Sequence, residues 1–106
     1  MDKKIIWTNE VYEDLESTAE YISRDSPFYA STFVEEVLLA AKNINRFPGR
    51  GRVVPEVDED DVREIFIKRF RLIYKVKSDR IIILALIHGA RDLETLWEED
   101  PRDKRY

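Results

Sequence analysis

Seven consecutive apolar residues, 81–87, form the most hydrophobic run in the chain and constrain its fold most strongly. An uninterrupted run of this length is typical of a central strand that is covered on both faces. Two more strand-like segments precede it, at residues 62–67 and 71–77, and the connections at 68–70 and 77–80 are short. Such close spacing favours antiparallel pairing. We therefore expect the second half of the chain to form a sheet with the apolar run inside it.

The first half of the chain predicts one short strand and two helices. Residues 3–7 are strand-like, and Thr8 or Asn9 can cap a helix whose apolar residues recur at helical spacing. Ser26 and Pro27 suit the cap and the first position of a second helix. The apolar stripe of this second helix comprises Ala30, Phe33, Val34, Val37, Leu38, Ala41 and Ile44. The sequence thus predicts an α+β fold of order β-α-α-β-β-β. Two antiparallel helices pack on a largely antiparallel four-stranded sheet, and a short C-terminal helix or tail follows.

Side-chain alternation in the strand before the apolar run predicts which residues face the helices. Leu72, Tyr74 and Val76 fall on one face and should lie beneath the helix hairpin. The other face carries Arg71 and Lys75, and we expect it to be open. Guanidinium groups anchored on a rigid sheet can bind planar anions through two hydrogen bonds at once. The open face is therefore predicted to be a recognition surface.

Length and composition limit the classes of protein that the chain can belong to. Its 106 residues suffice for a single domain over residues 1–106, built around one core. It has no cysteine and one histidine, which excludes disulfides, thiolate metal sites and multi-histidine metal sites. We find no signal peptide pattern and no apolar stretch of the length that a membrane span needs. We expect a cytoplasmic protein that needs no cofactor or metal.

Charge is distributed unevenly along the chain. Residues 1–45 carry 4 basic and 9 acidic side chains, and residues 92–106 carry 3 basic and 6 acidic ones. The strand-rich middle, residues 46–91, carries 11 basic and 7 acidic side chains. This asymmetry indicates one electropositive face rather than a generally basic nucleic-acid-binding protein.

Several short motifs occur in a fixed order along nearly the whole chain. They are Asp14-Leu15, Tyr21-Ile22, Asp25-Ser26-Pro27, Phe47-Pro48 with Gly51-Arg52, Val62-Arg63-Glu64, and the segments at residues 71–76 and 87–93. Each motif alone is weak, but their combination and order resemble the RelE/ParE superfamily of toxins from type II toxin–antitoxin systems. The resemblance implies the RelE/ParE-like fold, which agrees with the fold expected from the residue pattern.

The resemblance implies one of two activities. RelE-like members cut mRNA in the ribosomal A site without a metal, and basic side chains stabilise the charged transition state. ParE-like members share the fold but poison DNA gyrase. Both kinds are neutralised by an antitoxin whose C-terminal segment wraps the toxin and whose N-terminal domain usually binds promoter DNA.

Individual residues bear on the choice between these branches. Arg71 and Arg91 match two phosphate-binding arginines of RelE-like nucleases, and the imidazole of His88 could act as a general acid or base, so these three form the catalytic set that a nuclease would use. Trp97, however, stands where some RelE members have a catalytic tyrosine. Ile65 stands where they have a lysine. The resemblance therefore favours the ParE-like branch.

Four cations are predicted to contact the target or a nucleic acid: Arg63, Arg71, Lys75 and Arg91. Structural roles remain open for some of them and for the histidine. Arg63 can pair with Glu64 or with the acids at residues 58–61. Arg91 can pair with Asp92 or a C-terminal acid, and His88 can hydrogen-bond the backbone at the end of its strand.

We therefore expect a ParE-like toxin that inhibits growth by binding a target such as DNA gyrase. The alternatives are a ribosome-dependent mRNA endonuclease, or a degenerate member that only binds its antitoxin. The expected partners are a cognate antitoxin, along the helix hairpin or a free sheet edge, and gyrase or the ribosome. Promoter DNA is reached only through the antitoxin. Trp97 should pack a short C-terminal helix onto the sheet, and residues 98–106 should be mobile without a partner.

Overall fold

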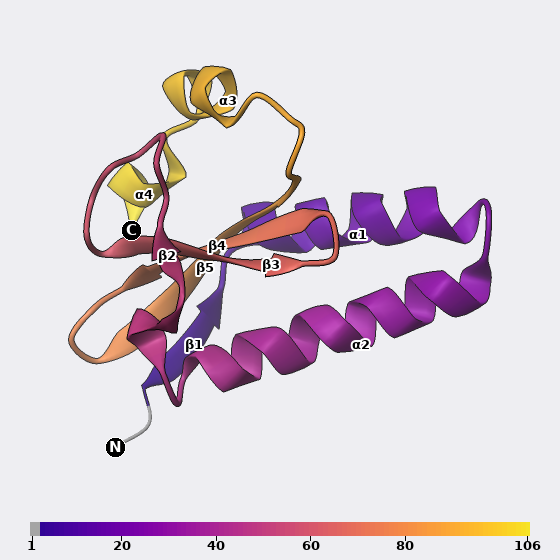
Figure 1. The fold of residues 1–106 in the computed structure, drawn as a ribbon, viewed down its shortest axis with the longest axis horizontal. Helices are drawn as coiled ribbons and strands as arrows, with labels where there is room; N and C mark the ends of the chain where they lie inside the picture. The colour runs from indigo at the N-terminus through magenta and orange to yellow at the C-terminus, as the bar shows by residue number, and fades with distance from the viewer. Residues whose placement is uncertain (1–2) are drawn as a thin grey trace.

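The computed structural model describes residues 3–106, in which two long helices lie along one face of a sheet and two short helices lie on the other (Figure 1). The elements in chain order are β1 (Lys4–Trp7), α1 (Asn9–Ser23), α2 (Pro27–Ile44), a 3-10 turn η1 (Pro48–Arg50), β2 (Arg52–Val53), β3 (Val62–Ile67), β4 (Phe70–Val76), β5 (Arg80–His88), α3 (Leu93–Glu99) and α4 (Arg102–Arg105). The predicted α+β fold is confirmed, as is the order of the two helices and the three long strands.

The sheet has five strands in the order β1-β5-β4-β3-β2, rather than the four that the sequence predicts. β1 pairs with β5 in parallel, and the other neighbours are antiparallel. The additional strand, β2, is two residues long and pairs Arg52 with Glu64 and Val53 with Arg63. The sequence did not predict it because two residues show no periodicity.

Both helix starts follow from local hydrogen bonds. The Thr8 hydroxyl accepts a hydrogen bond from the Val11 amide at 3.2 Å and donates one to the Ile83 carbonyl at 2.9 Å. The N-cap of α1 is therefore also tied to β5. Ser26 caps α2, accepting from the Tyr29 amide at 3.3 Å, and Pro27 occupies the first helical position as predicted.

The helix-facing side of the sheet carries the side chains that the strand alternation predicts. Leu72 and Tyr74 are fully buried against Phe33 and Val37 of α2, and Val76 is partly buried at the same cluster. The predicted phase of β4 is therefore confirmed. Exposed Leu38 is the exception within the predicted α2 stripe.

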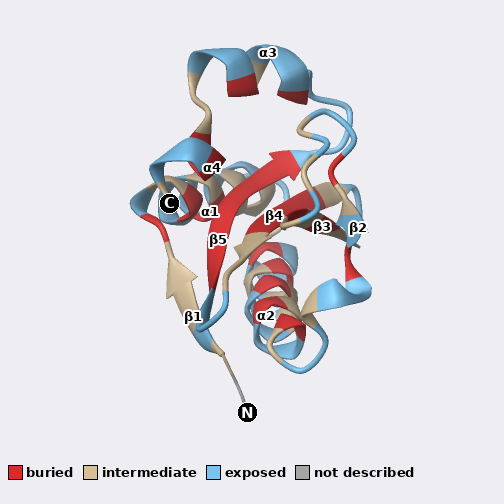
Figure 2. Ribbon diagram, turned by 90° about the vertical axis from the view of Figure 1, so that its left-hand side faces the viewer, coloured by how far each residue is buried: buried red, intermediate tan, exposed pale blue. Residues whose placement is uncertain are grey.

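The strand β5 is buried on both faces, as its apolar run predicts (Figure 2). A register shift in its pairing with β4, beside Ile73 and Tyr74, interrupts the alternation. Leu84 and Ala85 consequently pack on the same side of the sheet. An all-apolar run tolerates this shift, because either face of the strand meets other apolar side chains.

The second face of the sheet is closed, so the prediction that it is open is wrong. Val54, Leu93 and Trp97 cover Ile73 and Leu84 there and form a second apolar cluster. The physical reason lies in β5, whose apolar side chains on this face also require cover. Trp97 packs a short C-terminal helix onto the sheet, as expected.

The C-terminal residues are docked, which contradicts the expectation that residues 98–106 are mobile. Arg102 and Asp103 are buried. The Arg102 guanidinium lies 2.6 Å from Asp14 on α1 and donates a hydrogen bond to the Leu84 carbonyl at 3.0 Å. Asp103 accepts a hydrogen bond from the indole N–H of Trp97 at 2.6 Å. These contacts tie α4 to α1, to β5 and to α3.

Within residues 3–106, no helix combines the length and the apolar character that crossing a membrane requires.

Candidate functional site

Arg71 is buried in an ion-paired network, not exposed on an open face. Only 5% of the residue is accessible. Its Nε donates to Glu64 at 2.5 Å, and its two terminal nitrogens donate to the two oxygens of Glu56 at 2.9 and 2.8 Å. The hydrogen bonds with Glu56 and Glu64 raise the pKa of Arg71 above its ordinary value. Two carboxylates thus occupy the donors with which Arg71 could bind a phosphate.

Glu64 is the centre of this network. Its side chain is fully buried, and its second oxygen accepts from Nε of Arg52 at 2.5 Å. Glu56, on the loop after β2, binds Arg71 at the solvent-exposed side of the network. The hydrogen bond from Arg71 lowers the pKa of Glu56. Each oxygen of the buried Glu64 carboxylate thus accepts a hydrogen bond from a guanidinium, and neither is left without a partner.

Arg63 holds the turn at η1 in place. Its guanidinium donates to the Gly51 carbonyl at 2.9 Å and lies 3.1 Å from the Asp60 carboxylate. The predicted pairing with the acids at 58–61 is therefore confirmed through Asp60. The Tyr74 hydroxyl completes the turn, accepting from the Gly51 amide at 3.1 Å and donating to the Pro48 carbonyl at 2.8 Å. Burial raises the pKa of Tyr74.

Lys75 is also used within the fold. Its ammonium group donates to the Asp103 carbonyl at 2.9 Å, which ties β4 to α4. Three of the four predicted contact residues, Arg63, Arg71 and Lys75, thus make intramolecular bonds. Their direct binding roles stay untested predictions.

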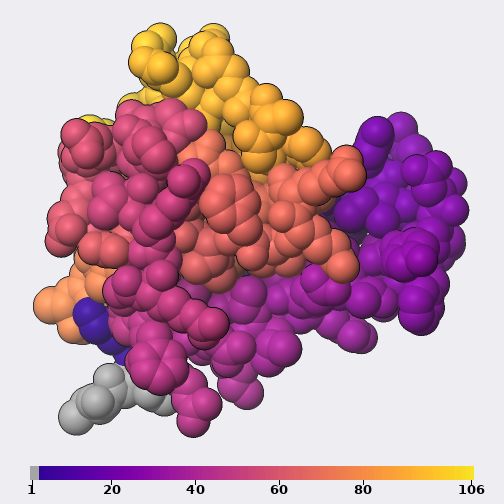
Figure 3. Space-filling view, in the orientation of Figure 1, coloured from indigo at the N-terminus to yellow at the C-terminus, as the bar shows by residue number. Residues whose placement is uncertain are grey.

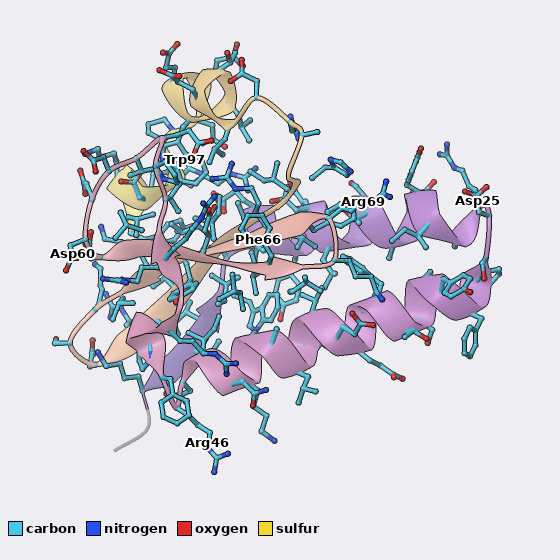
Figure 4. All side chains as sticks on the ribbon, viewed as in Figure 1. Asp25, Arg46, Asp60, Phe66, Arg69 and Trp97 are labelled. Atoms are coloured by element: carbon cyan, nitrogen blue, oxygen red, sulfur yellow. The ribbon has the colours of Figure 1, made fainter. Side chains whose placement is uncertain are left out.

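Arg91 and His88 lie exposed at the end of β5. Nδ1 of His88 accepts a hydrogen bond from the Ala90 amide at 3.1 Å, and its ring meets Phe70 edge-on with 5.3 Å between centroids. Among the described residues, the Arg91 side chain has no ion pair. The Gly89 amide donates to the Arg69 carbonyl at 2.7 Å, so exposed Arg69 lies at the same end of the sheet (Figure 4). The sequence interpretation did not single out Arg69, because its place in a two-residue turn gave no periodic signal.

An apolar groove of about 300 Å³ lies between the C-terminal half of α2 and β3, on the face that Figure 3 presents. Its lining residues are Ala40, Asn43, Ile44, Phe47, Arg50, Ile65, Phe66 and Tyr74. Phe47 and Phe66 remain 62% and 55% exposed, and the Arg52 guanidinium lies 5.1 Å from the centre of the Phe66 ring. Exposed apolar surface of this kind marks an interaction site.

Cations and an open strand edge border this groove. Lys42, Arg46 and Arg50 are exposed beside it. β2 pairs only with Arg63 and Glu64, so within residues 3–106 the outer side of β3 has no strand partner beyond Glu64. The groove therefore combines apolar floor, positive rim and a free strand edge. Sequence periodicity could not reveal it, because Phe47 follows a helix and Phe66 occupies an ordinary strand position.

The helix hairpin on a largely antiparallel sheet agrees with the fold that the resemblance of the motifs implies. The family described as "ParE toxin of type II toxin-antitoxin system, parDE" matches residues 5–93, and the chain belongs to this family. A solved structure, "Chromosomal ParDE TA system from P. aeruginosa", has the same fold with a TM-score of 0.67. It is 21% identical in sequence, and the match covers 81% of this chain and 95% of that chain. No curated protein matches the chain.

Proposed function

We propose that this ParE-family chain inhibits growth by binding DNA gyrase and does not cleave RNA. The observation that carries the proposal is the burial of Arg71 between Glu56 and Glu64. Metal-free phosphodiester cleavage needs fixed cations where negative charge develops in the transition state. A guanidinium that already neutralises two carboxylates is a poor group for this purpose. Arg71 instead joins the loop after β2 to the sheet.

Two further residues support the binding mode. Trp97 has no titratable hydroxyl, and its indole N–H is occupied by Asp103. Ile65 lines the apolar groove and cannot transfer a proton. Of the predicted contact residues, we propose that Arg91 contacts the target, because it is exposed and has no ion pair among residues 3–106. Arg63, Arg71 and Lys75 act through the fold.

We further propose that a cognate antitoxin neutralises the chain by filling the groove between α2 and β3. A segment with apolar side chains and acidic flanks would match the apolar lining and the positive rim formed by Lys42, Arg46 and Arg50. An extended stretch of the same segment could add a strand beside β3. Promoter DNA would be bound by the antitoxin. A gyrase target places the toxin in the cytoplasm.

Expression of the chain without its antitoxin tests the proposal. Growth should stop, and co-expression of the protein encoded by the adjacent reading frame should restore it. Loss of gyrase supercoiling in lysates, with intact mRNA, is the expected biochemical result. Ribosome-dependent cleavage of mRNA that requires Arg91 and His88 would favour the nuclease alternative. A chain that binds the antitoxin but leaves growth unchanged would favour the degenerate alternative.

A further inference from the structure

The turn between α1 and α2 carries three highly exposed aromatic side chains. Tyr21, Phe28 and Tyr29 are 69%, 74% and 66% exposed. They flank the turn at Asp25, which lies at the end of the molecule remote from β2 (Figure 4). Single exposed aromatics are common, but three within nine residues form an apolar patch of the kind that marks an interaction site. We call Tyr21, Phe28 and Tyr29 the aromatic tip.

The aromatic tip is held in a defined conformation. The amides of Asp25 and Ser26 both donate to the Ile22 carbonyl, at 3.1 and 3.0 Å, and the Ser26 hydroxyl caps α2. The Phe28 and Tyr29 rings meet edge-on with 5.9 Å between centroids. Buried Phe33 anchors the following turn of α2 in the core. A partner that binds these rings therefore meets a turn whose backbone is already ordered, which reduces the conformational entropy lost on binding.

The surroundings of the aromatic tip are acidic. Residues 16–36 contain five carboxylates and one arginine. Arg24 pairs with Glu20 at 3.5 Å, and Lys68, in the turn between β3 and β4, pairs with Glu36 at 3.4 Å. Glu16 and Asp25 are exposed and have no ion pair among the described residues. This surface is complementary to a partner that has an apolar depression with cations around it.

The groove at the other end of α2 is bordered by positive charge, whereas the aromatic tip is surrounded by negative charge. Its exposed border is formed by Lys42, Arg46 and Arg50. α2 has 18 residues, which separates the two ends by about 27 Å. One acidic segment that suits the groove would meet repulsion at the aromatic tip. The charge pattern thus favours different partners at the two ends.

We infer that the aromatic tip is a further surface, besides Arg91 at the end of β5, with which the toxin contacts its protein target, through a basic-rimmed apolar site on that target. The antitoxin occupies the groove at the other end of α2. This inference rests on the proposed function, because it names the toxin surface that reaches the target. Aromatic side chains at the centre of an interface commonly contribute most of the binding energy, so the three rings are the expected anchors.

The test is a triple variant, Tyr21→Gln, Phe28→Gln and Tyr29→Gln, with Tyr12→Gln as its control. Tyr12 is also exposed on α1, at 53%, but lies at the other end of that helix and stacks on Trp7. Both variants keep the net charge. The triple variant should bind purified gyrase about 1000-fold more weakly and lose growth inhibition, since three anchors that each contribute about 10-fold multiply to that factor. The Tyr12→Gln variant should match the wild type in both assays.

Three measurements on the triple variant can overturn the inference. Growth inhibition equal to that of the wild type would contradict it, as would a loss of antitoxin binding, which would place the tip in the antitoxin interface. If the wild type sediments as a dimer and the triple variant as a monomer, the aromatic tip serves self-association instead. If the wild-type chain itself leaves growth unaffected, the toxin function fails and the inference fails with it. A triple variant that still inhibits growth contradicts this inference but leaves the proposed function intact.

Discussion

The role of a charged residue in this chain depends on its exposure and its partners as well as on its charge. Arg71 and Arg91 both follow the nuclease pattern in the sequence. In the structure, Arg71 is buried between two carboxylates and Arg91 is exposed. The sequence predicted the phase of β4 correctly, and the apolar run of β5 indicated that both faces of the sheet need cover, but no local pattern showed that Arg71 is ion-paired there. That outcome depends on Glu56 and Glu64, which lie 15 and 7 residues away and carry no spacing signal.

Replacement of Glu64 should be strongly destabilising. Glu64→Gln removes the charge that two guanidiniums share, and leaves buried Arg71 with one carboxylate partner. Breaking a buried ion pair by removing one partner costs about 3–5 kcal/mol. Urea unfolding of the variant measures this loss. A change below about 1 kcal/mol would show that the network contributes little to stability.

Acid should weaken the same network through Glu56. Its pKa lies below the ordinary value of 4.5 in the folded protein, chiefly because Arg71 donates hydrogen bonds to it. The stabilisation is therefore complete above pH 4.5 and is lost as the pH falls through the lower, folded pKa. The free energy of unfolding should drop more steeply below that pH in the wild type than in Glu56→Gln. Equal slopes would contradict the pairing.

Two glycines in one turn give a matched comparison. A Cβ at Gly51 would lie 2.3 Å from the Tyr74 hydroxyl oxygen and 2.7 Å from the Glu64 carbonyl oxygen, whereas a Cβ at Gly49 meets nothing within 4 Å. Gly51→Ala should therefore destabilise the protein by about 1–3 kcal/mol through overpacking. Gly49→Ala should leave the melting temperature nearly unchanged. Similar melting temperatures for the two variants would contradict the proposed turn geometry.

At the scale of the elements, periodic segments were predictable and segments fixed by distant contacts were not. The capped helices and the long strands follow from local spacing, so α1, α2, β3, β4 and β5 agree closely with the expected ranges. β2 and α4 differ, because each depends on partners remote in sequence. Asp14 and Arg102, for example, are separated by 88 residues. No local sequence pattern indicates such a pair. The apolar groove and the aromatic tip were missed for a related reason, since exposure of an aromatic residue depends on what packs beside it.

Two substitutions in α4 test whether Arg102 holds this helix in place. Arg102→Ala removes the ion pair with Asp14 and the hydrogen bond to the Leu84 carbonyl, and leaves Asp14 without its main cation. Stability should fall by about 2–4 kcal/mol. Lys104→Ala removes an exposed pair with Glu59 and should leave stability nearly unchanged. Chemical unfolding compares the two, and equal effects would mean that α4 is not fixed by Arg102.

The whole molecule presents two separate surfaces, a positively rimmed groove and an acidic aromatic tip, at opposite ends of α2. Neither is needed for the core, whose side chains lie between α2 and the sheet and between α3 and the sheet. This separation allows a partner to bind one surface without filling the other. Neutralisation by the antitoxin then requires that its bulk, or an additional segment, also blocks access to the target.

Antitoxin binding should stabilise the folded chain by mass action. At a free antitoxin concentration 100 times the Kd, the gain is about 2.7 kcal/mol, which corresponds to a rise in Tm of roughly 10 °C for a domain of this size. Phe47→Gln should reduce this rise, because it removes an exposed aromatic ring from the groove. A differential scanning experiment that shows the same rise for both proteins would place the antitoxin elsewhere.

We propose that this chain inhibits growth by binding DNA gyrase and leaves RNA intact. The most direct measurement adds the purified wild-type chain to two assays side by side: plasmid supercoiling by DNA gyrase, and mRNA integrity on translating ribosomes. We predict loss of supercoiling at toxin concentrations that leave the mRNA uncut. Ribosome-dependent cleavage of mRNA by the wild-type chain, abolished by Arg71→Ala in a variant that remains folded, would contradict it.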